Sequence, residues 1–255
     1  MKNILKLILI SIFSTLIFIG CSLTNNKESN TELTISVAAS LKESMLEIKD
    51  LFEKDNPNIS LNLNFGSSGS LMQQIEQGAP CNLFISAGQS QMDSLEKKGF
   101  LQDNTRKNLL KNSLVLISSS DITNINDLCD NKIRHIAIGE PSSVPAGKYA
   151  DEVLANLNLK NTLSNKLVFA KDVKEVLSWV STGNAEAGFV YKSDTVNTNS
   201  IKIIEEIADD LHSPISYPIA IIKNNSNNED TLKFYNYLNS EESKNIFNKN
   251  GYEIL

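Results

Sequence analysis

The chain has 255 residues, of which 24 are Lys or Arg and 30 are Asp or Glu, and its formal net charge is −6. This length fits one large domain or two small ones, and the ordinary apolar content makes a buried core feasible. The negative balance, without any run of basic residues, argues against nucleic acid as a partner. The only two histidines, His135 and His212, leave little material for histidine-based catalysis or a histidine-rich metal site.

Residues 1–20 have the features of a bacterial lipoprotein signal peptide. Lys2 and Lys6 give a cationic start, and the apolar stretch from Ile4 to Ile19 is short for a membrane-spanning helix. The stretch ends in Phe18-Ile-Gly-Cys21, which resembles a lipobox, so we expect cleavage before Cys21 and lipidation of that cysteine. The alternative is an uncleaved N-terminal anchor. In both cases we expect the rest of the chain outside the cytoplasm, and lipidation would anchor it to the cell membrane.

Residues 21–32 are polar and predict a flexible tether between the lipid and the domain. Cleavage would remove the charges of Lys2 and Lys6 and change the net charge from −6 to −8. Cys81 and Cys129 would then remain as thiols. An extracytoplasmic location permits a disulfide between them, but free buried cysteines explain the sequence equally well.

From Leu33 onward, strand-like and helix-like stretches alternate. The first series is a strand at 33–37, a helix at 41–52, a strand at 59–65, a short helix at 71–77 ending at Gly78, a strand at 82–86 and a helix at 89–98. The second series is a strand at 114–117, a strand at 133–138, a helix at 145–157, a strand at 167–169, a helix at 173–180, strands at 187–191, 201–204 and 216–222, and a helical stretch at 231–248. This alternation predicts an α/β fold with mainly parallel sheets.

Two of the predicted helices in the first series begin with serine-rich signals. Ser40 and Glu43 have the spacing of a capping box, which places Ser40 at the N-cap. The segment from Ser70 to Gln73 is a second such box. Ser67 and Ser68 would then lie in the turn just before that helix, where their hydroxyls are accessible.

Two helices of the second series also have clear starts. Pro145 suits a first helical position because it has no N–H to leave unpaired. Ala146 and Gly147 would then present free amides that almost no side chain covers. Asp172 is placed to cap the fourth helix, with Val173 at its first position.

In open α/β sheets, ligands bind beyond the carboxyl ends of strands, where helices begin. Helix N-termini carry partial positive charge and directed N–H groups, so a cluster of them predicts an anion site. Tyr191, at the end of a predicted strand, can add a neutral hydroxyl donor. Asp172 would repel an anion unless its carboxylate turns onto its own helix, which we expect. Each motif alone is also explained by ordinary capping or turn formation.

These segments, in this order, resemble the molybdate-binding proteins of bacterial molybdate ABC importers. The resemblance runs from about Leu33 to the C-terminus. The matching segments are 37–41 (VAASL), 65–71 (FGSSGSL), 78–80 (GAP), 83–87 (LFISA), 112–115 (NSLV), 139–141 (GEP), 144–150 (VPAGKYA), 172–173 (DV), 188–191 (GFVY) and 217–218 (YP).

The resemblance implies which residues contact the oxyanion. Ser40, Ser68 and Tyr191 would offer hydroxyls, and Ala146 and Val173 would offer backbone amides. Relatives often have a third serine where this chain has Gly69, a departure that removes no inferred ligand.

The resemblance also implies a two-lobed periplasmic-binding-protein fold of type II, with the ligand between lobes that two chain crossings join. We expect lobe I at 33–112 plus 216–255 and lobe II at 113–215, with crossings near 112–114 and 213–216. Ligand binding would favour the closed form, which a membrane permease of an ABC importer would recognise. The chain would be a monomer, with no cofactor beyond the bound molybdate or tungstate and no metal coordinated directly by the protein.

Several alternatives stay open. Among oxyanions, neutral donors alone suit molybdate, tungstate or sulfate, and the choice depends on the cavity radius. A secreted serine hydrolase is disfavoured because the segment from Gly66 to Ser70 is not G-x-S-x-G and Ser94 to Lys97 lies on an exposed helix. A metal-binding lipoprotein lacks a cluster at ligand spacing. A module that binds only proteins is the remaining alternative.

Overall fold

The computed structural model describes residues 30–196, 198, 200–223 and 228–255. The predicted signal peptide, Cys21 and the tether up to residue 29 lie outside the described residues. Within the described ranges, no helix combines the length and apolarity needed to cross a bilayer.

Strands and helices alternate along most of the described chain. The strands are β1 Thr31–Ala38, β2 Ile59–Gly66, β3 Leu83–Ile85, β4 Lys107–Lys111, β5 Leu114–Ser118, β6 Ile136–Gly139, β7 Leu167–Ala170, β8 Ala187–Tyr191, β9 Lys202–Glu206, β10 Ser216–Ile221 and β11 Glu253–Ile254. The α-helices are α2 Lys42–Asp55, α3 Ser68–Glu76, α4 Gln89–Lys97, α5 Pro145–Asn156, α6 Lys160–Leu163, α7 Val173–Ser181, α8 Asn228–Tyr237 and α9 Glu241–Lys249. Short 3-10 turns are η2 Ala39–Leu41, η3 Ile125–Cys129, η4 Lys192–Thr195 and η5 Asp209–Leu211.

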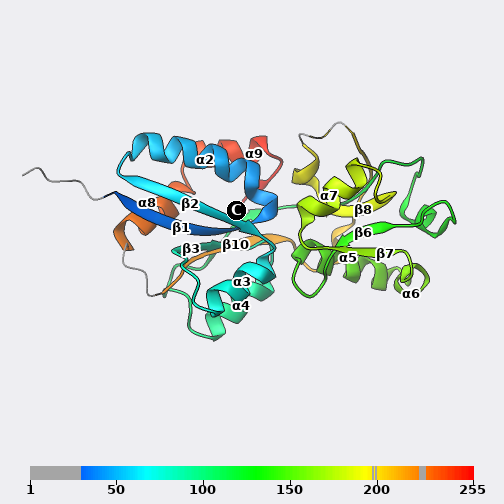
Figure 1. Cartoon of the computed structure of the whole chain (residues 1–255), viewed down its shortest axis with the longest axis horizontal. Coiled ribbons are helices and arrows are strands. Elements are labelled where there is room, and N and C mark those ends of the chain that lie inside the picture. The colour runs from blue at the N-terminus through cyan, green and yellow to red at the C-terminus, as the bar shows by residue number, and fades with distance from the viewer. Residues whose placement is uncertain (1–29, 197, 199, 224–227) are drawn as a thin grey trace, which may run out of the picture. The chain divides into compact units, whose positions relative to one another are not determined.

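The strands form two separate sheets. One has six strands in the order β11-β4-β10-β3-β1-β2, and the other has five in the order β7-β6-β8-β5-β9. Figure 1 shows α2, α8 and α9 on one face of the six-stranded sheet and α3 and α4 on the other, while α5 and α7 flank the second sheet. Lobe I denotes the six-stranded sheet with its helices, and lobe II the five-stranded sheet with its helices. We propose 33–112 with 216–255, and 113–215, as their bounds.

The sheets are mixed, so the expectation of mainly parallel sheets is wrong. β1 runs parallel to β2 and β3, and β6 runs parallel to β7 and β8. β10 is antiparallel to β3 and β4, β11 is antiparallel to β4, and β5 is antiparallel to β8 and β9. β5 and β10 are the first strands after the chain passes from one sheet to the other.

Other differences from the predicted elements are local. The helical stretch expected at 231–248 is two helices, because Ser240 caps α9 by accepting a hydrogen bond from Ser243 N at 3.2 Å. The strand expected from Ile133 begins at Ile136, and His135 lies exposed just before it. β4, β11, α6 and the 3-10 turns were not predicted, because each is short and lacks a periodic apolar pattern.

Candidate functional site

All five residues that the sequence analysis assigned to an oxyanion line one small cavity. Ser40 and Ser68 reach it from lobe I, and Ala146, Val173 and Tyr191 reach it from lobe II. Each of the five exposes no more than 4% of its surface. The fold therefore brings together donors that lie far apart in the sequence and removes them from bulk water.

Four helical starts converge on this cavity: η2 leading into α2, α3, α5 and α7. The first turn of a helix has free N–H groups and carries partial positive charge. The other lining residues are Ala38, Ala39, Gly66, Ser67, Ala87, Val144, Pro145 and Asp172. The lining thus contains no lysine or arginine, and any attraction for an anion must come from amides and hydroxyls.

Ser68 is the first residue of α3, which begins three residues earlier than predicted. The N-cap is Ser67, whose Oγ accepts from Ser70 N at 3.3 Å, so the predicted cap at Ser70 is wrong. The helix begins earlier because the Ser67 hydroxyl already satisfies a first-turn amide. Ser68 Oγ accepts a hydrogen bond from Ala87 N at 2.9 Å. Its own proton is therefore available to a ligand in the cavity.

Ser40 is also not a helix cap. It lies inside the turn η2, and the N-cap of α2 is Leu41, which makes no side-chain capping bond. The predicted capping box with Glu43 is wrong because this 3-10 turn intervenes between strand and helix. Ser40 Oγ instead lies 3.1 Å from Tyr217 Oη. Local spacing gave no signal for this contact with a distant strand.

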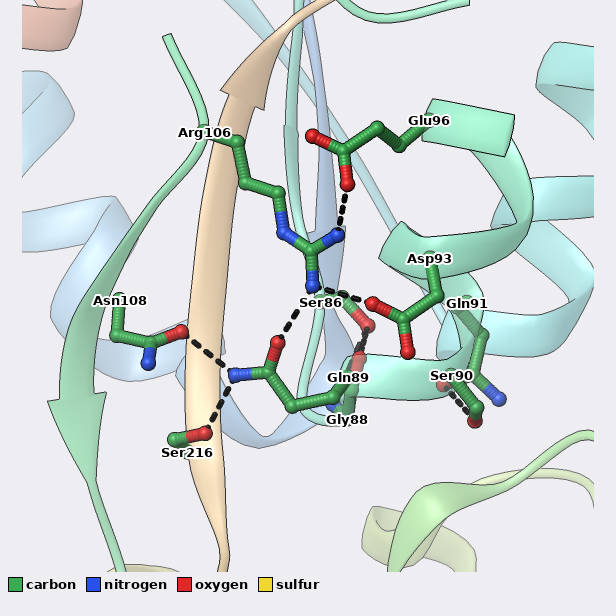
Figure 2. Close-up of polar contacts among 10 residues, drawn as sticks. All are labelled: Ser86, Gly88, Gln89, Ser90, Gln91, Asp93, Glu96, Arg106, Asn108 and Ser216. Carbon is green, nitrogen blue, oxygen red and sulfur yellow. Dashed lines mark hydrogen bonds and ion pairs between the residues drawn. The ribbon is translucent and has the colours of Figure 1, made fainter. Parts of the chain in front are cut away.

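The loop between β3 and α4 carries Ala87, which the sequence analysis did not assign to the site. Ser86 Oγ donates to Gly88 O at 2.7 Å, which holds the turn of this loop. Gln89 then ties the loop to β10, because its Nε2 donates to Ser216 Oγ at 2.6 Å. Figure 2 shows the surrounding bonds, which join Gln89 to Asn108 and Arg106, and Arg106 to Asp93 and Glu96. Ala87 is thus held in place as the partner of Ser68.

The lobe II amides come from the starts of α5 and α7. Pro145 occupies the first position of α5 as predicted, which leaves Ala146 in the first turn. Asp172 caps α7 by accepting from Glu175 N at 2.9 Å. The expectation that the Asp172 carboxylate turns onto its own helix is confirmed, and this keeps its charge engaged with amides that would otherwise be free.

Tyr191 ends β8 and reaches across to lobe I. Its hydroxyl donates to Ala87 O at 3.3 Å. Burial raises the pKa of Tyr191 well above its ordinary value, with a smaller contribution from nearby Tyr149. The hydroxyl therefore keeps its proton at neutral pH and is a hydrogen-bond donor.

The two lobes touch around the cavity. Gly69 N donates to Ser143 O at 2.8 Å, which joins α3 to the loop before α5. The cavity has a volume of about 10 Å³, room for roughly one water molecule. A tetrahedral oxyanion is larger than this.

A second polar cavity of about 160 Å³ lies beside the first and is lined by residues of both lobes, Ser40 among them. Lys174 Nζ lies 2.7 Å from a Glu43 carboxylate oxygen of lobe I and 3.0 Å from Asp194 Oδ1 of lobe II. Burial raises the pKa of the fully buried Asp194 to about 6, although Lys174 opposes that shift. This ion triad is a second link between the lobes.

The structure answers two other questions that the sequence left open. Cys81 is buried and Cys129 is exposed, and both are free, so no disulfide joins them. Among the described residues, no group of three or more His, Cys, Asp or Glu side chains is placed to hold a metal ion. His212 Nδ1 lies 2.8 Å from Ser213 O in a loop away from the cavity lining.

Comparisons with known proteins bear on this geometry. A family model for bacterial extracellular solute-binding proteins matches residues 33–253. The chain is 38% identical over 244 residues to YvgL of Bacillus subtilis (strain 168), named as an ABC transporter substrate-binding lipoprotein, and 93% of each chain is covered. It is 36% identical over 231 residues to the molybdate-binding protein ModA of Escherichia coli (strain K12), with 88% of this chain and 89% of ModA covered.

A solved structure from Clostridium difficile, described as the substrate-binding domain of a molybdenum ABC transporter, is 55% identical to this chain. The two align with a TM-score of 0.68 over 88% of this chain and 99% of that one. Together with the two sheets seen here, these similarities confirm the predicted α/β, two-lobed periplasmic-binding-protein fold.

Proposed function

This chain belongs to the family of bacterial extracellular solute-binding proteins, and we propose that it captures molybdate between its two lobes for import by an ABC transporter. The observation that carries the proposal is the convergence of neutral donors from both lobes on one buried cavity. A solute-binding family is not a family of enzymes, in keeping with the expectation that the chain catalyses no reaction.

The donor set suits a fully deprotonated dianion. Ser40 and Ser68 supply hydroxyls, and Ala146 and Val173 supply amides. The Tyr191 hydroxyl, which donates to Ala87 O in this structure, would turn its proton to the anion. Hydrogen bonds to a charged acceptor contribute about 1.5–3 kcal/mol each, so five of them can offset the desolvation of a small dianion. A protonated anion such as hydrogen phosphate would need an acceptor, and the Asp172 carboxylate is engaged with its own helix.

Molybdate is favoured among the dianions by similarity. The relative from Escherichia coli is named as a molybdate-binding protein, and the structure from Clostridium difficile is described as part of a molybdenum transporter. Tungstate has the same charge and tetrahedral shape, so we propose that it binds as well. Sulfate is smaller and is the competing candidate.

Capture couples to closure because the donors are divided between the lobes. An anion satisfies all five only when the lobes close, so binding shifts the population toward the closed form. We propose that a transporter permease recognises this form, which presents both lobes in one fixed arrangement.

Calorimetric titration of the purified domain with molybdate, tungstate and sulfate tests the proposal. We expect micromolar or tighter binding of molybdate and tungstate and much weaker binding of sulfate. Tight binding of sulfate alone would show that the ligand is sulfate and not molybdate. An absence of heat and of thermal stabilisation with all three oxyanions at millimolar concentration would refute an oxyanion function.

We further propose that the chain is a lipoprotein, anchored outside the cytoplasm through Cys21, with residues 1–20 removed as a signal peptide. The lipobox-like sequence supports this, as does the lipoprotein name of the relative from Bacillus subtilis. In a bacterial host, the Cys21→Ser variant should lose incorporation of radiolabelled fatty acid, whereas Cys129→Ser should keep it. Equal labelling of both variants would exclude Cys21 as the acceptor.

A further inference from the structure

A chain of hydrogen bonds runs from Asn112 through Tyr217 to Ser40. Asn112 Nδ2 lies 3.2 Å from Tyr217 Oη, which lies 3.1 Å from Ser40 Oγ. Asn112 follows β4, and Tyr217 lies on β10, so both stand beside the segments where the chain passes between the sheets. Tyr217 is completely buried and Ser40 is 4% exposed. Solvent therefore does not compete for the Tyr217–Ser40 bond.

The direction of this series of hydrogen bonds is set at Asn112. Ser113 N donates to Asn112 Oδ1 at 2.9 Å. A backbone N–H can only donate, so the atom that it contacts must be the amide oxygen. The amide nitrogen then faces the other way, where it donates to Ser193 Oγ at 2.8 Å and to Tyr217 Oη.

The direction continues at Tyr217. Its oxygen accepts from Asn112, so its own proton can be donated either to Ser40 Oγ, 3.1 Å away, or to the hydroxyl of Tyr191, with which its side chain also makes a hydrogen bond. Burial raises the pKa of Tyr217 well above its ordinary value, which keeps that proton on the hydroxyl. When Tyr217 donates to Ser40 Oγ, Ser40 has its own proton left for the cavity.

We infer that Tyr217 and Asn112 are positioning residues that turn the Ser40 hydroxyl proton toward the bound anion, an inference that rests on the proposed oxyanion function. Ser68 is arranged in the same way, because it accepts from Ala87 N and keeps its proton for the cavity. Each serine donor of lobe I thus has one protein donor behind it. That donor is a backbone amide for Ser68 and a tyrosine hydroxyl for Ser40.

A double-mutant cycle tests the inference by molybdate calorimetry on the purified domain. Tyr217→Phe removes the hydroxyl and keeps the ring, and it should weaken molybdate binding about three- to tenfold, the value of one neutral hydrogen bond. In the Ser40→Ala background the same substitution should change affinity less than twofold, because the group through which it acts is already absent.

Tyr252→Phe is the matched control. Tyr252 belongs to the same aromatic cluster, with its ring centroid 5.5 Å from that of Tyr217, and its hydroxyl donates to the backbone oxygen of Ser40 at 2.7 Å. Because Ser40→Ala keeps the backbone oxygen that Tyr252 contacts, any effect of Tyr252→Phe on affinity should largely persist in the Ser40→Ala background. Thermal unfolding of each variant shows whether it is folded.

Asn112→Ala provides a second route should Tyr217→Phe not fold. It removes the donor to Tyr217, which can then accept from Ser40 and draw the Ser40 proton away from the anion. We expect a two- to fivefold loss of affinity that also disappears in the Ser40→Ala background.

The outcomes separate this inference from the proposed function. If the wild-type domain binds molybdate but Tyr217→Phe costs the same in both backgrounds, Tyr217 acts through another group, such as Tyr191 with its ring 5.7 Å away, and the inference is wrong. Unchanged affinity in both Tyr217→Phe and Asn112→Ala would also overturn it. A wild-type domain that binds no oxyanion would remove the proposed function itself.

Discussion

The two lobes contribute to the cavity in different ways. Lobe I supplies the side-chain hydroxyls of Ser40 and Ser68, each of which needs a neighbour to set its direction. In the proposed site, lobe II supplies the backbone amides of Ala146 and Val173, whose direction is set by the helices in whose first turns they lie. Tyr191 is the one lobe II side chain among the five, and it reaches across to Ala87 of lobe I.

This difference has a consequence for mutation. A hydroxyl is lost when its side chain is replaced, and its neighbour loses a partner as well. A backbone amide survives every substitution except proline, so a change of side chain at Ala146 or Val173 tests packing rather than binding. The lobe II half of the site can therefore be tested only by removing an N–H, and the lobe I half by removing a hydroxyl.

Val173→Pro is expected to have the largest effect, because it deletes a lobe II amide directly. Val173 is the first residue of α7 and follows an extended Asp172, which is the position where proline best fits a helix. The loss of one hydrogen bond to a charged ligand should weaken molybdate binding by about 1.5–3 kcal/mol, measured by calorimetry.

Glu241→Pro is a matched control for this change. Glu241 is the first residue of α9 and follows the cap Ser240, away from the cavity lining. It should leave the affinity unchanged. Equal affinity in Val173→Pro and the wild type would show that the Val173 amide does not bind the anion.

Ser68→Ala is the corresponding change in lobe I. It removes the proposed donor and leaves Ala87 N without its partner, so we expect binding to weaken by roughly 1–3 kcal/mol while folding remains intact. Ser94, on α4 and outside the cavity lining, is the control, and Ser94→Ala should bind like the wild type. An affinity for Ser68→Ala that matches this control would exclude Ser68 as a ligand.

Gly69→Ala tests the contact between the lobes rather than a donor. A Cβ at this position would lie 2.5 Å from Ser143 O and 2.6 Å from Ser143 Cα, closer than real contacts allow. The closed form should be strained while the open form is not, which weakens binding by about 1–2 kcal/mol. Small-angle scattering with saturating molybdate should then show a larger radius of gyration than for the wild type. Wild-type affinity and wild-type compaction would show that the loop at Ser143 yields freely.

Titration of Asp194 should change the affinity for molybdate least, because this residue lies outside the cavity lining. Its expected effect is on the stability of the fold. Burial raises the pKa of Asp194 to about 6, and the nearby Glu43 carboxylate also raises it. Lys174 and the backbone amide of Tyr191 lower the pKa and so oppose this shift. An acid with a raised folded-state pKa binds more protons folded than unfolded. Stability should therefore fall as the pH rises from about 4 to about 6.

The Asp194→Asn variant isolates this effect from the other titrating groups. Its stability relative to the wild type, measured by urea unfolding, should improve across that interval of pH. A difference between the two proteins that stays constant with pH would place the Asp194 pKa near its ordinary value.

The parts of the fold that local patterns govern were predictable. Pro145 suits the first position of α5 because it has no N–H of its own, and Asp172 caps α7 by accepting from an amide three residues ahead. Both helix starts were predicted. The caps expected at Ser40 and Ser70 follow the same kind of rule and were wrong. A 3-10 turn displaced the first from its cap position, and Ser67 took the place of the second.

Sheet direction was not predictable from element type. The apolar sequence pattern of a strand such as β5 or β10 is the same whether the strand runs parallel or antiparallel to its neighbours. Its direction is decided by the passage of the chain from one lobe to the other. The short strand β4 carries lysines at both ends and no alternating pattern, so it is recognisable as a strand only from its pairing with β10 and β11.

The amino-acid sequence alone determined where α5 and α7 begin, that the candidate donors are neutral, and which family the chain resembles, because these depend on neighbours within a few positions and on motifs read in order. Only the tertiary structure decided where η2 and α3 begin, that the helix starts share one buried cavity, and which groups each hydroxyl contacts. The Ser40 hydroxyl meets Tyr217, 177 residues away. Such a contact arises because the turn η2, which follows β1, packs beside β10, and no local spacing predicts this.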